Sequence, residues 1–267
     1  MTRPPRLTIL FDNYPGVPGL TTLWGFAALI EIDGETDGET GGHRILFDTG
    51  SNGRALLKNM AALGVDPASV DCLFLSHPHW DHMGGLDSVL ELNPHLTLVL
   101  HEGFSKHLIA DLRRQCAELI VVGPEPRALL PGVLSTGMMD ADPMRAGPPE
   151  HGLILNASDG ATGSAGAAGV TAAISGCAHP GMERIVERGA AMLGKRIDWA
   201  IGGFHLMYAD AVEIQRAIRA FQALDIVCVV PTHCTGDTAR AAFRQAYGER
   251  CIEGGVGRQI LIRPPHP

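Results

Sequence analysis

The sequence lacks the features that mark membrane, secreted and nucleic-acid-binding proteins. No run reaches the roughly 18 uncharged apolar residues of a membrane span. The first residues, MTRPPRLTILFDNYPG, contain no apolar segment of the kind found in secretory signals. The formal charge of −8 provides no basic surface for nucleic acid or for an anionic membrane. We therefore expect a soluble, cytoplasmic protein that binds neither.

The cysteines also lack any recognisable spacing. There are six, at positions 72, 116, 177, 228, 234 and 251, and they form neither a zinc ribbon nor a disulfide scaffold. Cys72 and Cys228 lie inside apolar runs, so we interpret them as small core residues.

The remaining composition is that of an ordinary globular protein, with 45% hydrophobic and 19% charged residues in 267. Neither a composition break nor a repeat divides the chain, so we expect one domain over residues 1–267. Apolar patterns predict strands at 6–11, 24–32, 44–47, 71–75, 96–100, 153–156, 169–175, 198–201 and 226–230. They predict helices at 53–63, 85–92, 102–112, 182–193, 211–224 and 237–247. This alternation favours an α/β fold of two packed sheets flanked by helices.

Three segments have little regular pattern. Residues 31–42 are acidic and glycine-rich, which indicates a hairpin turn. Residues 123–150 are rich in proline and glycine, and we expect loops with short strands there. Residues 157–168 form a Gly/Ala/Ser tract that we expect to be mobile, between two strands that pair as a hairpin.

The densest cluster of side chains that can bind a metal follows the apolar strand at 71–75. Three histidines and an aspartate fall within six residues of the segment Ser76-His77-Pro78-His79-Trp80-Asp81-His82-Met83-Gly84-Gly85-Leu86. Imidazole and carboxylate groups are ligands for zinc, iron and manganese. A lone His-x-His is usually a surface feature. The complete His-x-His-x-Asp-His pattern after a buried strand, followed by two glycines, instead predicts a metal site.

This segment resembles the first metal motif of the metallo-β-lactamase superfamily, and Leu46-Phe47-Asp48-Thr49-Gly50 is similar to that family's upstream Asp-x-Gly strand end. The chain also resembles one branch of the superfamily, whose members are often labelled 7,8-dihydropterin-6-methyl-4-(β-D-ribofuranosyl)aminobenzene-5′-phosphate synthases. The matching pieces span nearly the whole chain, at residues 11–13, 46–50, 76–86, 175–181, 202–206 and 232–236. The resemblance implies an αββα four-layer sandwich.

Three later histidines, His179, His205 and His233, each follow an apolar strand. The resemblance implies that His233 is the last metal ligand. Our preferred arrangement therefore contains two divalent metal ions. We favour zinc as the metal, with manganese or iron as alternatives. His77, His79 and His179 would hold one ion, and Asp81, His82 and His233 the other. His205 is either a further ligand or the group that protonates the leaving group.

The sequence departs from the superfamily where an aspartate usually bridges two metals. Gly176-Cys177 occupies that place, so Cys177 is either a ligand or a small buried residue, and the site holds one ion or two. No confident match exists to the separate histidine motif expected before it. Glu150-His151 is the nearest candidate.

These residues predict a hydrolase in which a metal-bound hydroxide attacks an ester, phosphoester or related bond of a small molecule. Asp81 would also orient the nucleophile, while Asp48 and Asp12-Asn13 would orient ligands. A phosphorylated substrate remains compatible with the acidic balance because a bound metal can dominate the field of a pocket. Its cationic contacts would be among Arg145, Arg184 and Lys195, and the loops at 15–22 and 123–150 would frame the pocket.

Three other functions compete with hydrolysis. The branch label implies a synthase acting on a pterin and a phosphorylated ribosyl compound. Redox chemistry at a di-iron site is disfavoured, because His79 stands where flavodiiron relatives carry glutamate and because no flavodoxin domain fits after His233. An iron-dependent oxygenase is a further minor alternative. A non-catalytic metal-binding module would need a less complete ligand set.

Overall fold

Two β-sheets form the centre of the fold in the computed structural model, which describes residues 3–32, 35–36, 39–40, 42–144, 146–157 and 169–264. The first sheet has seven strands, in the order β15 (Gln259–Leu261), β1 (Arg6–Phe11), β2 (Ala27–Ile32), β5 (His43–Phe47), β6 (Cys72–Phe74), β7 (Thr97–His101) and β8 (Glu118–Val122). The second has six, in the order β14 (Cys228–Thr232), β13 (Trp199–Gly203), β12 (Val170–Ser175), β11 (Leu153–Ala157), β10 (Val133–Ser135) and β9 (Arg127–Leu130). A separate ribbon pairs β3 (Glu35–Thr36) with β4 (Glu39–Thr40), within the hairpin expected at 31–42.

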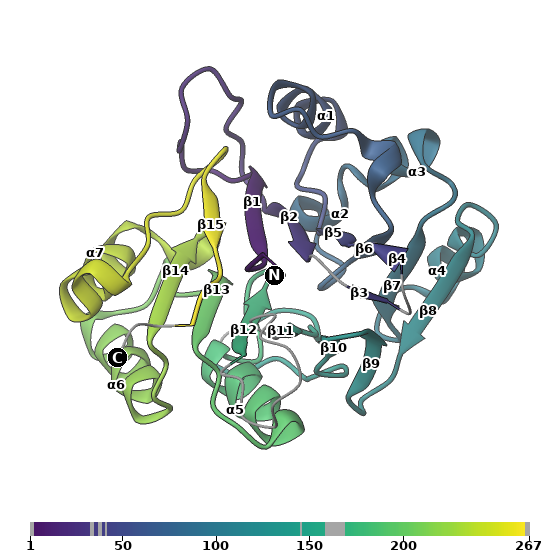
Figure 1. Ribbon diagram of the computed structural model, residues 1–267. Coiled ribbons are helices and arrows are strands. Elements are labelled where there is room, and N and C mark those ends of the chain that lie inside the picture. The colour runs from purple at the N-terminus through teal and green to yellow at the C-terminus, as the bar shows by residue number, and fades with distance from the viewer. Residues whose placement is uncertain are drawn as a thin grey trace.

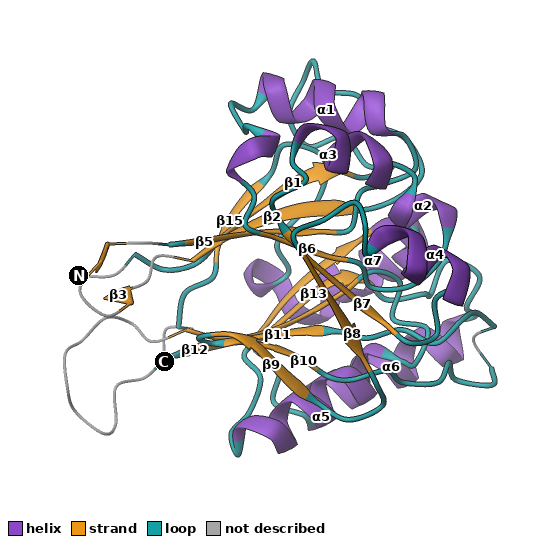
Figure 2. Cartoon of the chain, turned by 90° about the vertical axis from the view of Figure 1, so that its right-hand side faces the viewer, coloured by secondary structure: helices purple, strands orange, loops and turns teal. Residues whose placement is uncertain are grey.

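Helices cover the outer face of each sheet (Figures 1 and 2). The first sheet carries α1 (Gly53–Ala62), α3 (Leu86–Leu92) and α4 (Lys106–Leu112), and the second carries α5 (Met182–Leu193), α6 (Ala211–Ala223) and α7 (Asp237–Tyr247). The short helix α2 (Trp80–Met83) lies within the histidine cluster. None of the described helices has the length and apolar character needed to cross a bilayer.

Strand periodicity explains this layering, because alternate side chains point to opposite faces of a sheet. Phe47 and Phe74 of the first sheet pack against the second sheet in the central apolar cluster. Their neighbours Leu46 and Leu73 point outward and pack against α1 and α3. A third cluster joins the outer face of the second sheet to α5, α6 and α7. The fold is therefore the predicted αββα sandwich.

The parallel strands of both sheets end on one edge. Strands β5 to β8 are parallel, as are β12 to β14. Strand β1 points the same way as β5, because β1 and β5 are each antiparallel to β2. Loops that leave the carboxyl ends of such strands meet at one edge, where α/β proteins bind ligands.

Several predicted boundaries need correction. The helix expected at 102–112 begins only at Lys106, because the Glu102 amide bonds the Val122 carbonyl at 2.9 Å and prolongs the strand pairing. Strands β8 and β15 were not predicted from the sequence. The histidine cluster that follows β6 includes the helical turn α2, which was not predicted from the sequence. The hairpin pairing β11 with β12 is confirmed, but 158–168 in its connection lies outside the described residues.

Candidate metal centre

Three imidazole nitrogens converge at the edge where the strands end. His77 and His79 follow β6, and His179 follows β12 in the other sheet. His77 Nε2 lies 3.1 Å from His79 Nδ1, which lies 3.3 Å from His179 Nε2. Two nitrogens bound tetrahedrally to one zinc ion at about 2.05 Å would lie about 3.3 Å apart. The three nitrogens are thus spaced as ligands of one ion.

A second set of groups lies beside the first. Asp81 Oδ2 is 3.3 Å from His233 Nε2 and 3.8 Å from His82 Nε2. Asp81 and His82 lie on α2, and His233 follows β14 of the other sheet. The structure thus brings together all six predicted ligands, in the two groups expected.

The outer nitrogens of these rings are anchored, so that the inner ones face the site. His82 Nδ1 is 2.7 Å from Asp48 Oδ2, and His233 Nδ1 is 2.9 Å from Asn13 Oδ1. His179 Nδ1 is 3.2 Å from the carbonyl oxygen of Ala146. An acceptor at one ring nitrogen fixes the proton there and leaves the other nitrogen free to bind a metal.

Asp48 connects the two groups. Its buried carboxylate accepts hydrogen bonds at 2.7 Å from the Ser76 amide, from the Ser76 hydroxyl and from His82 Nδ1. The Ser76 hydroxyl oxygen in turn lies 2.9 Å from His77 Nδ1 and can accept its proton. One carboxylate therefore orients a ring in each group. The hydrogen bonds expected of Asp48 and Asn13 are present, and Asp12 Oδ1 accepts from the His233 amide at 3.2 Å.

The site's electrostatics favour cation binding. Burial, followed by the neighbouring His205 and His79, lowers the pKa of His179 to about 3, and burial with nearby histidines keeps the pKa of His77 well below its usual value. Both rings are therefore neutral donors at neutral pH. Burial also lowers the pKa of His82, but the charge and hydrogen bond of Asp48 outweigh it and raise this pKa to about 9. An ion binding at His82 Nε2 must therefore displace a proton.

Asp81 remains ionised at neutral pH. Burial alone would raise its pKa, but the hydrogen bond from His233 and the charges of His82 and His233 hold this pKa well below the usual value. A charged carboxylate beside two imidazoles is a suitable ligand and a hydrogen-bond acceptor, and it is no source of protons.

Glu150 has a structural part in the site that sequence reasoning missed. Its buried carboxylate accepts bonds from the amides of Gly176 at 2.9 Å, Cys177 at 3.1 Å and His179 at 2.9 Å. It thereby holds the loop that carries His179. The only sequence signal was an acidic residue three positions before a buried strand.

His151, the other half of the Glu150-His151 candidate, has both ring nitrogens occupied away from the site. Its Nε2 is 2.9 Å from the Leu75 carbonyl oxygen, and its Nδ1 is 2.9 Å from Ser135 Oγ. Its ring stacks on Phe74 with centroids 4.1 Å apart. His151 is therefore a packed core histidine in this structure.

Backbone strain concentrates at the site. In the part of the chain that the structure describes, five non-glycine residues have a positive φ, and four of them surround the site: Asp48 (55°), Ala178 (56°), His205 (51°) and His233 (45°). Each such conformation costs about 1–3 kcal/mol and persists only where the surrounding structure imposes it. This is typical of a functional site, and nothing in the sequence signalled it.

His205 lies beside the first group, with its ring centroid 4.5 Å from that of His179. It lines a pocket of about 280 Å³ together with Trp24, Met144, Ala146, Met207, Tyr208, Ala209, Glu213 and Cys234. Among the suggested phosphate contacts, Arg184 and Lys195 are not among the described residues that line this pocket. Arg184 Nη1 bonds the carbonyls of Pro180 and Asp140, and Lys195 is exposed in the turn before β13, at the opposite end of the sheet from the site. Arg145 lies outside the described residues.

Comparison with known proteins agrees with this geometry. Residues 38–233 match the family profile of the metallo-β-lactamase superfamily. The chain belongs to this superfamily. A superfamily structure titled Tm1679, a metal-dependent hydrolase, superposes with a TM-score of 0.73 at 22% identity, over 96% of this chain and 98% of that one.

The branch resemblance is also confirmed. The 7,8-dihydropterin-6-methyl-4-(β-D-ribofuranosyl)aminobenzene-5′-phosphate synthase of Methanocaldococcus jannaschii is 30% identical over 278 residues, covering 91% of this chain and 92% of the relative. An uncharacterised protein of the same organism, MJ0448, is 27% identical over 89% of this chain and 93% of its own length.

Proposed function

We propose that this metallo-β-lactamase superfamily member is a metal-dependent hydrolase of a small-molecule ester, phosphoester or related bond. One observation carries the proposal. The inner nitrogens of His77, His79 and His179 are spaced as ligands of a single ion, and the outer nitrogens of His77 and His179 are held by acceptors. Histidines packed only for stability have no need of such converging nitrogens.

Two divalent ions fit the arrangement of donors. The first would be held by His77, His79 and His179, and the second by Asp81, His82 and His233. Imidazole-rich sets favour zinc, with iron and manganese as alternatives. When bound, such ions supply Lewis acidity and make water nucleophilic at neutral pH.

Two side chains would direct the reaction. Asp81 is ionised and accepts hydrogen bonds, so it orients the attacking water toward the substrate. His205 stands between the first group of histidines and the pocket, and from there it can protonate a leaving group.

The pocket indicates what part of the substrate enters. Its volume of about 280 Å³ suits a portion of a small molecule. The lining side chains include Trp24, Tyr208, Met144 and Met207, and none of the described residues that line the pocket is a lysine or arginine. We therefore assign to this pocket a planar or apolar part of the substrate, with any phosphoryl group placed over the metal ions.

A synthase activity is the second candidate. It is favoured by the 30% identity to a relative named as a synthase of a pterin-linked ribofuranosyl-aminobenzene phosphate. The same pocket, with Trp24 and Tyr208 in its lining, would accept a planar heterocycle. Incubation with a dihydropterin that carries a leaving group on its methyl substituent and with a phosphorylated ribosyl-aminobenzene would distinguish the two, because only a synthase joins the pterin to the aminobenzene and releases the leaving group.

Metal quantification by mass spectrometry, beside assays on phosphodiesters, thioesters and lactones, tests the hydrolase. We expect two equivalents of zinc, manganese or iron in the wild type, with metal content and turnover falling in His79→Ala and His233→Ala. His95→Ala changes an exposed histidine and serves as the matched control. A wild type that holds no metal even after reconstitution would refute the hydrolase and favour a non-catalytic module.

A further inference from the structure

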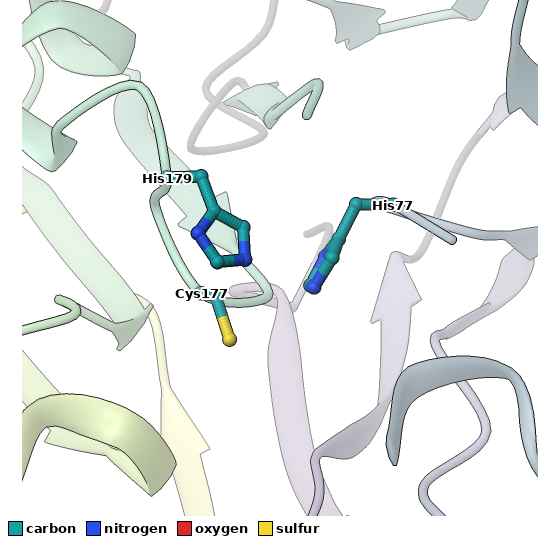
Figure 3. Close-up of side chains that lie close together, drawn as sticks. All are labelled: His77, Cys177 and His179. Atoms are coloured by element: carbon teal, nitrogen blue, oxygen red, sulfur yellow. The ribbon is translucent and has the colours of Figure 1, made fainter. Parts of the chain in front are cut away.

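Cys177 lies where the two groups of ligands meet. It follows β12 and is only 3% exposed. Its sulfur lies 3.3 Å from His82 Nε2. The same sulfur is within 4.8 Å of the ligand atoms of His77 and His179 and, in a second grouping, of those of His82 and His233. Figure 3 shows the three side chains close together, with the Cys177 sulfur below the His77 and His179 rings in this view.

We propose that Cys177 is a metal ligand shared by the two sites, its thiolate taking the place of a bridging carboxylate. This inference rests on the proposed function, since it requires the two ions that the hydrolase would use. A small core residue would satisfy the burial of Cys177, but it would not explain why its sulfur faces donors of both groups.

The surrounding chain fixes the position of that sulfur. Glu150 Oε1 accepts hydrogen bonds from the amides of both Gly176 and Cys177, so the backbone that carries the Cys177 side chain is held in place. Gly176 leaves room for the close approach of Asp48 and His82. A Cβ there would lie 2.8 Å from Asp48 Oδ2 and 3.0 Å from His82 Nδ1. These restraints place the sulfur over the site, whereas a core cysteine needs none of them.

Charge and bond length agree with a shared thiolate. The first group consists of neutral imidazoles, and the second has one carboxylate, Asp81. A thiolate would add an anionic donor to each. With zinc–sulfur bonds of about 2.3 Å, one sulfur can join ions up to about 4.6 Å apart. That range includes the roughly 3.5–4 Å separation of two-metal sites. Because thiolate is a soft ligand, the site should select zinc over manganese.

Cys234 is the neighbour that must be distinguished from Cys177. Its side chain is buried, and its sulfur lies 3.6 Å from the Cys177 carbonyl oxygen. Its sulfur lies within 4.8 Å of the ligand atoms of Cys177 and His205, and Cys234 belongs to neither of the two groups of ligands proposed above. Cys234 therefore provides a matched control of the same chemistry, a few ångströms from the shared position.

Cobalt(II) substitution tests the assignment, because a thiolate–cobalt bond gives a near-ultraviolet charge-transfer band that imidazole and carboxylate ligands do not. We expect the band in cobalt-loaded wild type and in Cys234→Ser. It should disappear in Cys177→Ser, with cobalt falling from two equivalents toward one. Cys177→Asp should lose the band but keep two equivalents, and its zinc-over-manganese preference should be at least tenfold weaker than that of the wild type.

Three outcomes would overturn the assignment. A band that persists in folded Cys177→Ser, or one lost only in Cys234→Ser, would assign the sulfur ligand to another residue. Bound cobalt without any sulfur band in the wild type would refute the shared thiolate and leave the hydrolase proposal intact. Failure of the wild type to take up cobalt at all would refute both.

Discussion

Replacing Asp48 with asparagine should disable the metal centre while leaving the fold in place. The carboxylate accepts three buried hydrogen bonds of 2.7 Å, and bonds to charged groups contribute about 1.5–3 kcal/mol each. Asparagine can still accept from the Ser76 amide, but its own amide group then faces His82 Nδ1. His82 can avoid two opposed donors by losing its Nδ1 proton and keeping the one at Nε2, the atom that would bind metal. The same change removes the acceptor for the Ser76 hydroxyl.

We therefore expect Asp48→Asn to weaken metal binding by about 10- to 100-fold, as is usual when the partner of a metal-binding histidine is lost. The free energy of unfolding of the metal-free protein should fall by roughly 2–4 kcal/mol, about one to two charged bonds. Competition with a chromogenic chelator measures the first quantity, and urea unfolding measures the second.

Asp198→Asn is the matched control for this experiment. Asp198 is also a buried carboxylate, and it accepts bonds from the Thr171 amide and hydroxyl and from Arg196. It lies at the opposite ends of β12 and β13 from the metal centre. This variant should lose stability but bind metal as the wild type does. Unchanged metal affinity in Asp48→Asn, or an equal loss in both variants, would refute the tautomer argument.

Three further changes have defined outcomes. Gly176→Ala should displace the Asp48 carboxylate, which lowers the free energy of unfolding by about 1–3 kcal/mol and releases the bound metal. The control Gly194→Ala lies at an open helix end with a positive φ, so it should lower stability without affecting metal binding. Metal analysis and thermal unfolding distinguish these two outcomes. Burial lowers the pKa of His101 to about 4, so the folded state resists a proton that the unfolded state accepts below 6.5. His101 alone should then lower the stability of the chelator-treated protein by on the order of 3 kcal/mol as the pH drops from 6.5 to about 4, in addition to the losses from the other buried histidines. Urea unfolding should show a fall that is smaller by this amount in His101→Gln. Trp24→Ala should raise the KM of substrates with planar groups without changing metal content; an unchanged KM would place the substrate elsewhere.

The sequence predicted the parts of the site that are contiguous along the chain. His77, His79, Asp81 and His82 follow one buried strand, so their convergence follows from local spacing. His179 could be added because it ends an apolar strand, and parallel strands end at one edge of a sheet. His233 also ends an apolar strand, but its place as the last ligand was implied by the family resemblance. The layered fold followed from the alternation of apolar strands and amphipathic helices.

The sequence could not predict contacts that depend on how the two sheets face each other. The role of Glu150 in holding the Gly176–His179 loop, the alignment of Cys177 with both groups, and the chain from Asp48 through Ser76 to His77 all arise from tertiary packing. Some predicted boundaries of helices and strands were wrong for a related reason. At Glu102, pairing with the neighbouring strand overrode a local helical pattern.

The placement of the proposed ligands has a consequence for the resistance of the protein to unfolding and proteolysis. Each group takes donors from both sheets, and His79 and His179 are 100 residues apart in the sequence. An ion held by both would act as a cross-link, and closing a loop of that length restricts the unfolded chain by on the order of 5 kcal/mol in chain-entropy terms. Removal of the metal by a chelator would break this cross-link between the two sheets and expose the interface between them to proteases. For this protein, metal supply would then control the amount of intact protein as well as its activity.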